Sequence, residues 1–120
     1  MIHHREMRIN IRPFKHSVLI EVIGSIDMDT SPSLRNRLLK AYQSDKNLII
    51  DLSEVTYMDS SGVATLVEGL SWSKKIHRDF VLVGLGVNLY NTLTLSKLNH
   101  IFNIRSSTAL AGLETMDNTI

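Results

Sequence analysis

The run NLIIDL, residues 47 to 52, constrains the fold of this chain more than any other stretch. It is short and almost continuously apolar, which is typical of a strand buried on both faces of a sheet. The run FVLVGL at 80 to 85 has the same character. Since such strands need helices to cover their sheet, and helical patterns separate these runs, the sequence predicts an α/β fold.

The segments around the two runs alternate between strand and helix patterns. Residues 7 to 14 and 17 to 24 are rich in β-formers and predict a hairpin. A first helix is expected after a Ser31 cap, with Pro32 in the first helical position. A second helix follows the D-S-S-G stretch, and its apolar face consists of Val63, Leu66, Val67 and Leu70. The remaining segments predict a third helix at 87 to 98, a short strand at 101 to 104 and a last helix at 106 to 114. We expect a single domain over 1–120, with an ordered core of about 7–114, built as a sandwich of about four helices on a mixed sheet of four to five strands.

Composition narrows the possible functions. The chain has 120 residues and 43% hydrophobic side chains, enough for one compact core. With 13 basic and 12 acidic residues, its net charge of +1 gives no broad field, so we expect no direct nucleic-acid binding. No stretch approaches the length of a membrane span, so we expect no membrane insertion. Cysteine is absent, which excludes disulfides and thiolate catalysis and fits a reducing compartment. The start MIHHREMRIN lacks the apolar core of a signal peptide, so a cytoplasmic location is expected.

The stretch TYMDSSGVATL, residues 56 to 66, carries the residues of greatest interest. In the simplest interpretation, Asp59 or Ser60 caps the free N–H groups of the second helix and Gly62 eases the turn. An exposed serine at a helix N-terminus is also well placed for phosphorylation, because free amides and the positive end of the helix dipole accommodate a phosphate. These residues alone are compatible with both interpretations.

The wider pattern of strand, D-S-S-G and amphipathic helix closely resembles the STAS family of anti-sigma factor antagonists. The family motif D-S-S-G is matched by Asp59, Ser60, Ser61 and Gly62, and an earlier motif of glycine, any residue, an apolar residue and aspartate is matched by Gly24, Ser25, Ile26 and Asp27. The similarity covers nearly the whole chain, including the order of strands and helices.

The resemblance implies a regulator that switches partners. In such families the unphosphorylated protein binds an anti-sigma factor that is also a serine kinase, phosphorylation of the D-S-S-G serine ends the interaction, and a serine phosphatase restores it. This chain would then be a substrate and no enzyme, without a cofactor and monomeric when free. The acceptor carried over from the motif is Ser60, with Ser61 as the second candidate, and Asp27 and Asp59 would flank it.

Helical geometry suggests a partner-binding surface on the second helix. Ser61, Thr65, Glu68 and Trp72 lie opposite the apolar face, so we expect an exposed docking stripe anchored by the tryptophan. In the alternative, the helix ends near Ser71 and the indole folds back over the sheet edge.

Other functions have weaker support. The histidines His3, His4, His16, His77 and His100 lack a helix-borne metal spacing, so no metal site is expected. Ser60 does not lie in a G-x-S-x-G nucleophile elbow, which disfavours a serine hydrolase. The stretch GLGVN at 84 to 88 predicts a tight turn more than a phosphate-binding loop. The main alternative is an accessory STAS subunit of a lipid-transporting ABC system, which would need no phosphorylation.

Overall fold

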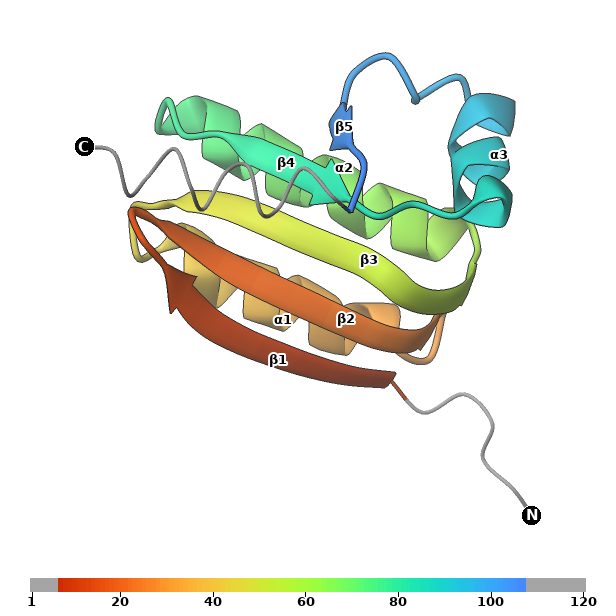
Figure 1. Ribbon diagram of the computed structural model, residues 1–120, viewed down its shortest axis with the longest axis horizontal. Coiled ribbons are helices and arrows are strands. Elements are labelled where there is room, and N and C mark those ends of the chain that lie inside the picture. The colour runs from red at the N-terminus through yellow and green to blue at the C-terminus, as the bar shows by residue number, and fades with distance from the viewer. Residues whose placement is uncertain (1–6, 108–120) are drawn as a thin grey trace.

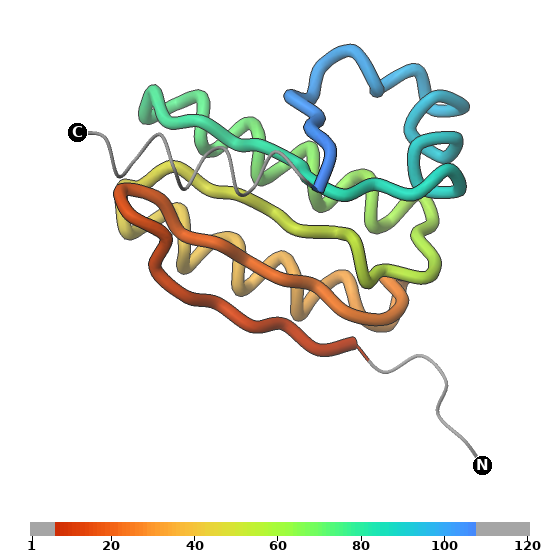
Figure 2. Tube along the Cα trace, viewed as in Figure 1, coloured from red at the N-terminus to blue at the C-terminus, as the bar shows by residue number. Residues whose placement is uncertain are grey.

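The computed structural model describes residues 7–107, which form an α/β domain around one five-stranded sheet (Figure 1). Its elements are β1 (Met7–Phe14), β2 (Ser17–Ile26), α1 (Ser31–Tyr42), β3 (Asn47–Met58), α2 (Ser60–Lys75), β4 (Phe80–Val83), α3 (Val87–Leu95) and β5 (Asn103–Arg105). The strands lie in chain order across the sheet, so the N-terminal hairpin and β5 form opposite edges (Figure 2). The helix expected at 106 to 114 falls, from residue 108 on, outside the described residues.

The sheet is mixed, as the sequence predicts. β1 pairs with β2 in an antiparallel hairpin, and the pairs β2–β3, β3–β4 and β4–β5 are parallel. Both α1 and α2 lie on one face of the sheet, behind it in Figure 1, while α3 lies beside the end of β3. In a parallel sheet all strands end at the same edge, so the loops after β2, β3 and β4 gather there.

The NLIIDL run forms the first half of β3 and is buried on both faces, as expected. Leu48, Ile50 and Leu52 belong to the main core, which also includes Leu38 of α1 and Leu66 of α2. Ile49 points to the opposite face. There it joins a smaller buried cluster with Phe14, Leu19, Val81 and Val83.

Strand β3 is longer than the apolar run. It continues through SEVTYM to Met58, and its pairing with β2 shifts register twice, between Glu21 and Ile23 and between Gly24 and Ser25. These irregularities interrupt the alternation of inward and outward side chains. Periodicity therefore did not identify the second half of the strand.

The expected cap of α1 is wrong by one residue. Thr30 is the N-cap, Ser31 is the first helical residue, and Pro32 is therefore the second. The Thr30 hydroxyl does not cap the helix, because it donates to the Ser25 carbonyl at 2.8 Å and accepts from the Asp27 amide at 2.9 Å. The residues before α1 are thus organised around Asp27.

Ser73 of α2 offers a test of the packing between α2 and the sheet. Its side chain is buried, and its hydroxyl has no hydrogen-bond partner among residues 7–107. We expect Ser73→Ala to raise the free energy of unfolding by about 1 kcal/mol, because it removes an unsatisfied buried group and improves helix propensity. Urea unfolding measures this, with the exposed Ser71→Ala as the matched control for propensity alone. A gain no larger than that of Ser71→Ala would contradict the expectation.

Candidate functional site

The candidate site forms where β2 and β3 end side by side. Ile26 and Met58 are the last paired residues of these strands, and the Asp59 amide donates to the Ile26 carbonyl at 3.1 Å. The residues that follow, Asp27 and Asp59, therefore leave the sheet together. Asp27 and Ser60 thus lie at the same end of the sheet.

Asp59 is the cap of α2. Its backbone is extended, and its Oδ1 accepts hydrogen bonds from the Ser61 amide at 2.9 Å and the Gly62 amide at 3.3 Å. Of the two candidate caps, the structure therefore has Asp59 and not Ser60. A carboxylate in this position also interacts favourably with the positive end of the helix dipole.

The two serines of the motif have different surroundings. Ser60 is the first residue of α2, and its side chain is exposed. Its hydroxyl makes no hydrogen bond within the described part of the chain. Ser61 is half-buried, and its hydroxyl donates to Asp59 Oδ1 at 2.5 Å. Of these two serines, Ser60 alone is exposed and has a hydroxyl with no hydrogen bond to any of residues 7–107.

Gly62 lets the first turn of α2 lie directly on the strand ends. A Cβ atom at this position would stand 2.6 Å from Cγ of Met58 and 2.8 Å from Cγ2 of Ile26. Distances this short are excluded for real side chains, so the position requires glycine. The glycine of the motif thereby fixes the height at which Ser60 projects from the sheet.

Asp27 organises the neighbouring loop. Its side chain is only 4% exposed. Oδ1 accepts hydrogen bonds from the amides of Asp29 at 2.9 Å and Thr30 at 3.1 Å. Asp27, Asp29 and Asp59 are all acidic, and the loop residues 27–30 and 59 include no lysine or arginine. Three carboxylates therefore lie at this end of β2 and β3.

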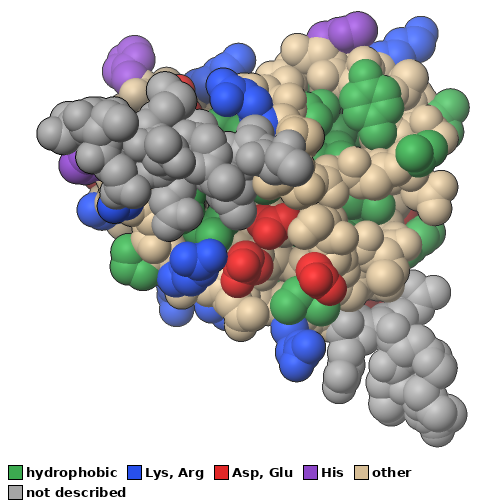
Figure 3. Space-filling model, viewed as in Figure 1, with side chains coloured by type: hydrophobic (Ala, Val, Ile, Leu, Met, Phe, Trp, Pro, Cys, Tyr) green, Lys and Arg blue, Asp and Glu red, His purple; other side chains and the backbone are tan. Residues whose placement is uncertain are grey.

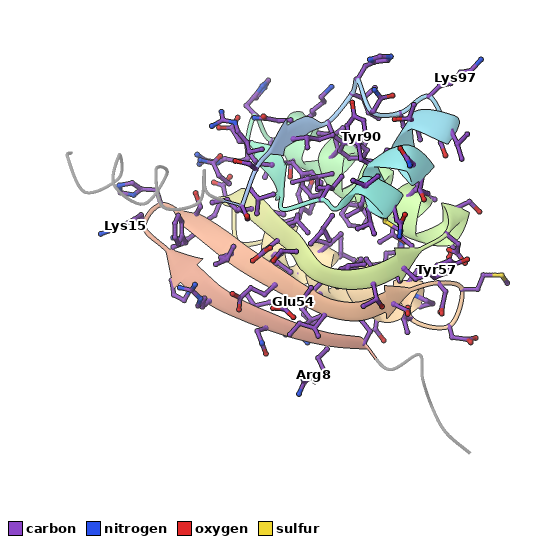
Figure 4. All side chains as sticks on the ribbon, turned by 45° about the vertical axis from the view of Figure 1, so that its right-hand side comes forward. Arg8, Lys15, Glu54, Tyr57, Tyr90 and Lys97 are labelled. Atoms are coloured by element: carbon purple, nitrogen blue, oxygen red, sulfur yellow. The ribbon has the colours of Figure 1, made fainter. Side chains whose placement is uncertain are left out.

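Large apolar side chains flank these carboxylates. Met28, between Asp27 and Asp29, is 77% exposed, and Tyr57, two residues before Asp59, is 49% exposed. Figure 4 shows Tyr57 at this end of the sheet and Lys15 at the opposite end. Exposed methionine and tyrosine side chains are typical of protein-binding surfaces.

The expected docking stripe on α2 is wrong in orientation. Thr65 is buried, Glu68 Oε1 accepts a hydrogen bond from Arg35 Nε of α1 at 2.8 Å, and Trp72 packs against the core. Helical periodicity identified the side that faces the sheet but could not show that α1 lies alongside α2 and covers a second side. The side that remains exposed carries Ser60, Ala64, Ser71 and Lys74.

The alternative for Trp72 is also wrong, since α2 runs on to Lys75. Its indole lies 5.9 Å from the Tyr42 ring, centroid to centroid, and the Arg35 guanidinium carbon is 5.3 Å from the indole centroid. Trp72 thus joins the two helices. It is not a free anchor for a partner.

We expect Trp72→Ala to lower the free energy of unfolding by about 2 kcal/mol, because it removes a half-buried aromatic side chain and its contacts with α1. Thermal unfolding measures this effect, and Trp72→Phe, which keeps a ring against Tyr42, should recover part of the loss. An unchanged melting temperature for Trp72→Ala would show that the indole adds little to the packing of the helices.

Within residues 7–107, no three His, Asp or Glu side chains are placed to hold a metal ion together. No helix in the same range is both long and apolar enough to cross a bilayer.

Comparison with known proteins identifies the family. The sequence matches the STAS domain over residues 8–111. The chain belongs to the STAS domain family. It is 33% identical over 89 residues to an anti-sigma-B factor antagonist of Listeria monocytogenes, covering 72% of this chain and 77% of that protein. The Bacillus subtilis anti-sigma-B factor antagonist is 26% identical over 98 residues, covering 82% of this chain and 90% of the relative.

Solved structures of similar proteins confirm the α/β fold. An anti-sigma factor antagonist from Mycobacterium paratuberculosis superposes with a TM-score of 0.79 at 21% identity, over 92% of this chain and 95% of that one. The unphosphorylated form of the anti-sigma factor antagonist SpoIIAA gives 0.77 at 14% identity, over 94% and 99% of the two chains. A sulfate transporter family protein from Wolinella succinogenes gives 0.72 at 16% identity, over 92% and 93%. Since the fold also occurs in a transporter family, fold alone does not assign a function.

Proposed function

We propose that this STAS protein is a phosphorylation-controlled partner switch. The unmodified chain binds an anti-sigma factor that is also a serine kinase and thereby frees the target of that factor. Phosphorylation of Ser60 ends the interaction, and a serine phosphatase reverses it. In this scheme the chain is a cytoplasmic substrate, monomeric when free, and it catalyses no step itself.

One observation carries the choice of acceptor, namely the contrast between the two serine hydroxyls. Phosphoryl transfer requires that the hydroxyl oxygen attack a phosphorus atom in line with the leaving group, so the hydroxyl must be accessible. Ser60 is exposed and unbonded within the described residues, whereas Ser61 is half-buried and bonded to Asp59. Modification of Ser61 would break that bond at the start of α2. The geometry therefore favours Ser60.

The charges at the site support a release mechanism. A phosphate on Ser60 adds about 1.5 to 2 negative charges. The amides of Ser61 and Gly62 could otherwise donate hydrogen bonds to an anion at the start of the helix, but they already donate to Asp59. The new charge thus adds to those of Asp27, Asp29 and Asp59 and stays exposed toward the partner. Repulsion of a partner docked over Ser60 follows without any change of fold.

The partner surface in this proposal differs from the stripe expected from periodicity. It includes Met28 and Tyr57 beside the carboxylates and the exposed side of α2 at Ala64 and Ser71. Ser61 and Glu68 lie toward its border with α1, and their contribution to binding stays a prediction.

Phosphosite mapping tests the proposal. The chain and its Ser60→Ala and Ser61→Ala variants are incubated with ATP and the serine kinase encoded beside its gene or recovered with the unmodified chain. Mass spectrometry should find one phosphate on Ser60 in the parent chain and in Ser61→Ala, and none in Ser60→Ala. Phosphate on Ser61 that persists in Ser60→Ala would overturn the assignment.

A further inference from the structure

A second surface, remote in sequence from the D-S-S-G motif, lies along the N-terminal edge of the sheet. β1 is an edge strand whose alternate residues Met7, Ile9, Ile11 and Pro13 share one face. Ile9 and Ile11 pair with Val22 and Ile20, which belong to the core beneath α1, so this face points toward the helix side. α1 lies behind β2 and leaves β1 projecting beyond it (Figure 1).

Two hollows follow this uncovered face. One, of about 350 Å³, is lined by Met7, Ile9, Ser33, Asn36 and Arg37. The other, of about 300 Å³, is lined by Ile11, Arg12, Pro13, Ser17, Val18 and Lys46. Ile9 and Ile11 are successive residues on the same face of β1, so the two hollows lie one after the other along this strand. We call these lining residues the β1–α1 groove.

The floor of the groove is apolar and incompletely buried. Ile11 is 38% exposed, and Met7 and Ile9 are half-buried. Isolated exposed apolar side chains are common, but a row of them along an edge strand is typical of an interaction surface.

The charges around the groove are basic. Arg12, Arg37 and Lys46 line it, Lys40 lies one helical turn beyond Arg37, and no lining residue is acidic. All charged residues that line the β1–α1 groove are therefore positive. Figure 3 shows the opposite face of the sheet, away from α1 and from this groove.

These cations are largely unpaired. No acidic side chain among residues 7–107 forms an ion pair with Arg37, Lys40 or Lys46, and Arg12 only approaches Glu21 at 3.9 Å. Arg78 shows the contrast, since its hydrogen bond and charge hold the pKa of Asp45 below its usual value. The net charge of +1 for the whole chain conceals this local excess.

We propose that the β1–α1 groove binds an acidic amphipathic helix of a partner protein. Its apolar side chains fill the hollows, and its Asp and Glu side chains pair with Arg37, Lys40 and Lys46. The spacing fits, because Ile9 and Ile11 are about 7 Å apart along the strand and helix residues four positions apart rise about 6 Å. Apolar anchors at this spacing are the usual mode of helix-in-groove recognition.

The same observations disfavour other occupants. An added strand would meet Pro13, which has no backbone N–H to donate at the free edge of β1. A second copy of this chain would bring two basic rims together, which costs free energy. The groove shares no residue with the D-S-S-G site, so this inference is independent of the switch at Ser60.

An NMR titration of the full chain with two designed peptides tests the inference. Both peptides are amphipathic helices with the same leucine stripe, and one carries glutamate where the other carries lysine. The glutamate peptide should bind saturably, shifting amide signals of Ile9, Ile11 and Ser33, and its affinity should fall as salt rises. The lysine peptide should not bind.

Three variants distinguish groove binding from general charge attraction. Ile11→Asp and Arg37→Glu should each weaken binding of the glutamate peptide at least about tenfold. Lys97 is an exposed lysine after α3, and Lys97→Glu should leave the affinity for this peptide unchanged. Ser60→Asp should also leave it unchanged. Thermal unfolding checks that each variant is folded. No saturable binding, an equal loss in Lys97→Glu, or preference for anionic phosphatidylglycerol vesicles or for self-association over the peptide would overturn the inference.

Discussion

Gly62→Val is expected to lower the free energy of unfolding by about 3 kcal/mol, the upper range for overpacked sites. The first branching atom would lie within 2.8 Å of both Met58 and Ile26 side-chain carbons, and both side chains are buried. To accommodate valine, α2 must lift from the ends of β2 and β3. The substitution should therefore also displace Ser60 and weaken partner binding.

Ala64→Val provides the matched control for Gly62→Val. Ala64 lies two residues further along α2 with an exposed side chain, so valine there should cost only the difference in helix propensity, about 0.5 kcal/mol. Urea unfolding of both variants separates close packing from propensity. Equal losses would mean that the approach of α2 to the strand ends does not require glycine.

Ser60→Asp is expected to weaken binding of the anti-sigma partner about a hundredfold, close to 2.7 kcal/mol, because it adds a charge to an end of the sheet that already carries Asp27, Asp29 and Asp59. Ser60→Ala should bind within about twofold of the parent chain, since the Ser60 hydroxyl makes no hydrogen bond within the described residues. Calorimetric titration measures both affinities.

Ser71→Asp tests whether position matters for this effect. Ser71 is exposed on the same side of α2 as Ser60 but lies about 16 Å further along the helix. A partner docked over the motif should tolerate a charge there much better. If Ser71→Asp and Ser60→Asp weaken binding equally, the charge acts through the overall field and not at a local switch.

The sequence predicted most elements because their local patterns agree with their surroundings in the fold. NLIIDL is buried on both faces, and the β1–β2 hairpin has the expected residues within two positions at each end. Asp59 also serves as a cap, as one of the two interpretations of the motif expects. Local patterns of this kind predict the structure correctly where tertiary contacts favour the same conformation.

The failures arise where a second element decides the outcome. Trp72 lies opposite the apolar face of α2, but Tyr42 and Arg35 of the adjacent α1 contact it, and a single-helix pattern contains no information on that neighbour. Likewise, the hydroxyl of Thr30 is held by Ser25 and Asp27, residues of the preceding strand and loop. The motif resemblance ranked Ser60 before Ser61, but the different surroundings of the two hydroxyls required coordinates.

Net charge was a poor guide to surface charge. Cations gather along the β1–α1 groove, while carboxylates gather after β2 and β3. Neither group is apparent in the net charge of +1, which sums all 13 basic and 12 acidic residues of the chain. Charge-dependent partners therefore have to be judged from individual faces of the molecule.

A single phosphate on Ser60 should be enough to release the partner. This expectation is tested most directly by titrating the anti-sigma kinase with the same chain before and after stoichiometric enzymatic phosphorylation, in ADP so that no phosphoryl transfer occurs during the measurement. We expect tight binding of the unmodified chain, at least about a hundredfold weaker binding of the Ser60-phosphorylated chain, and recovery after phosphatase treatment. Equal affinity of the two forms would contradict it.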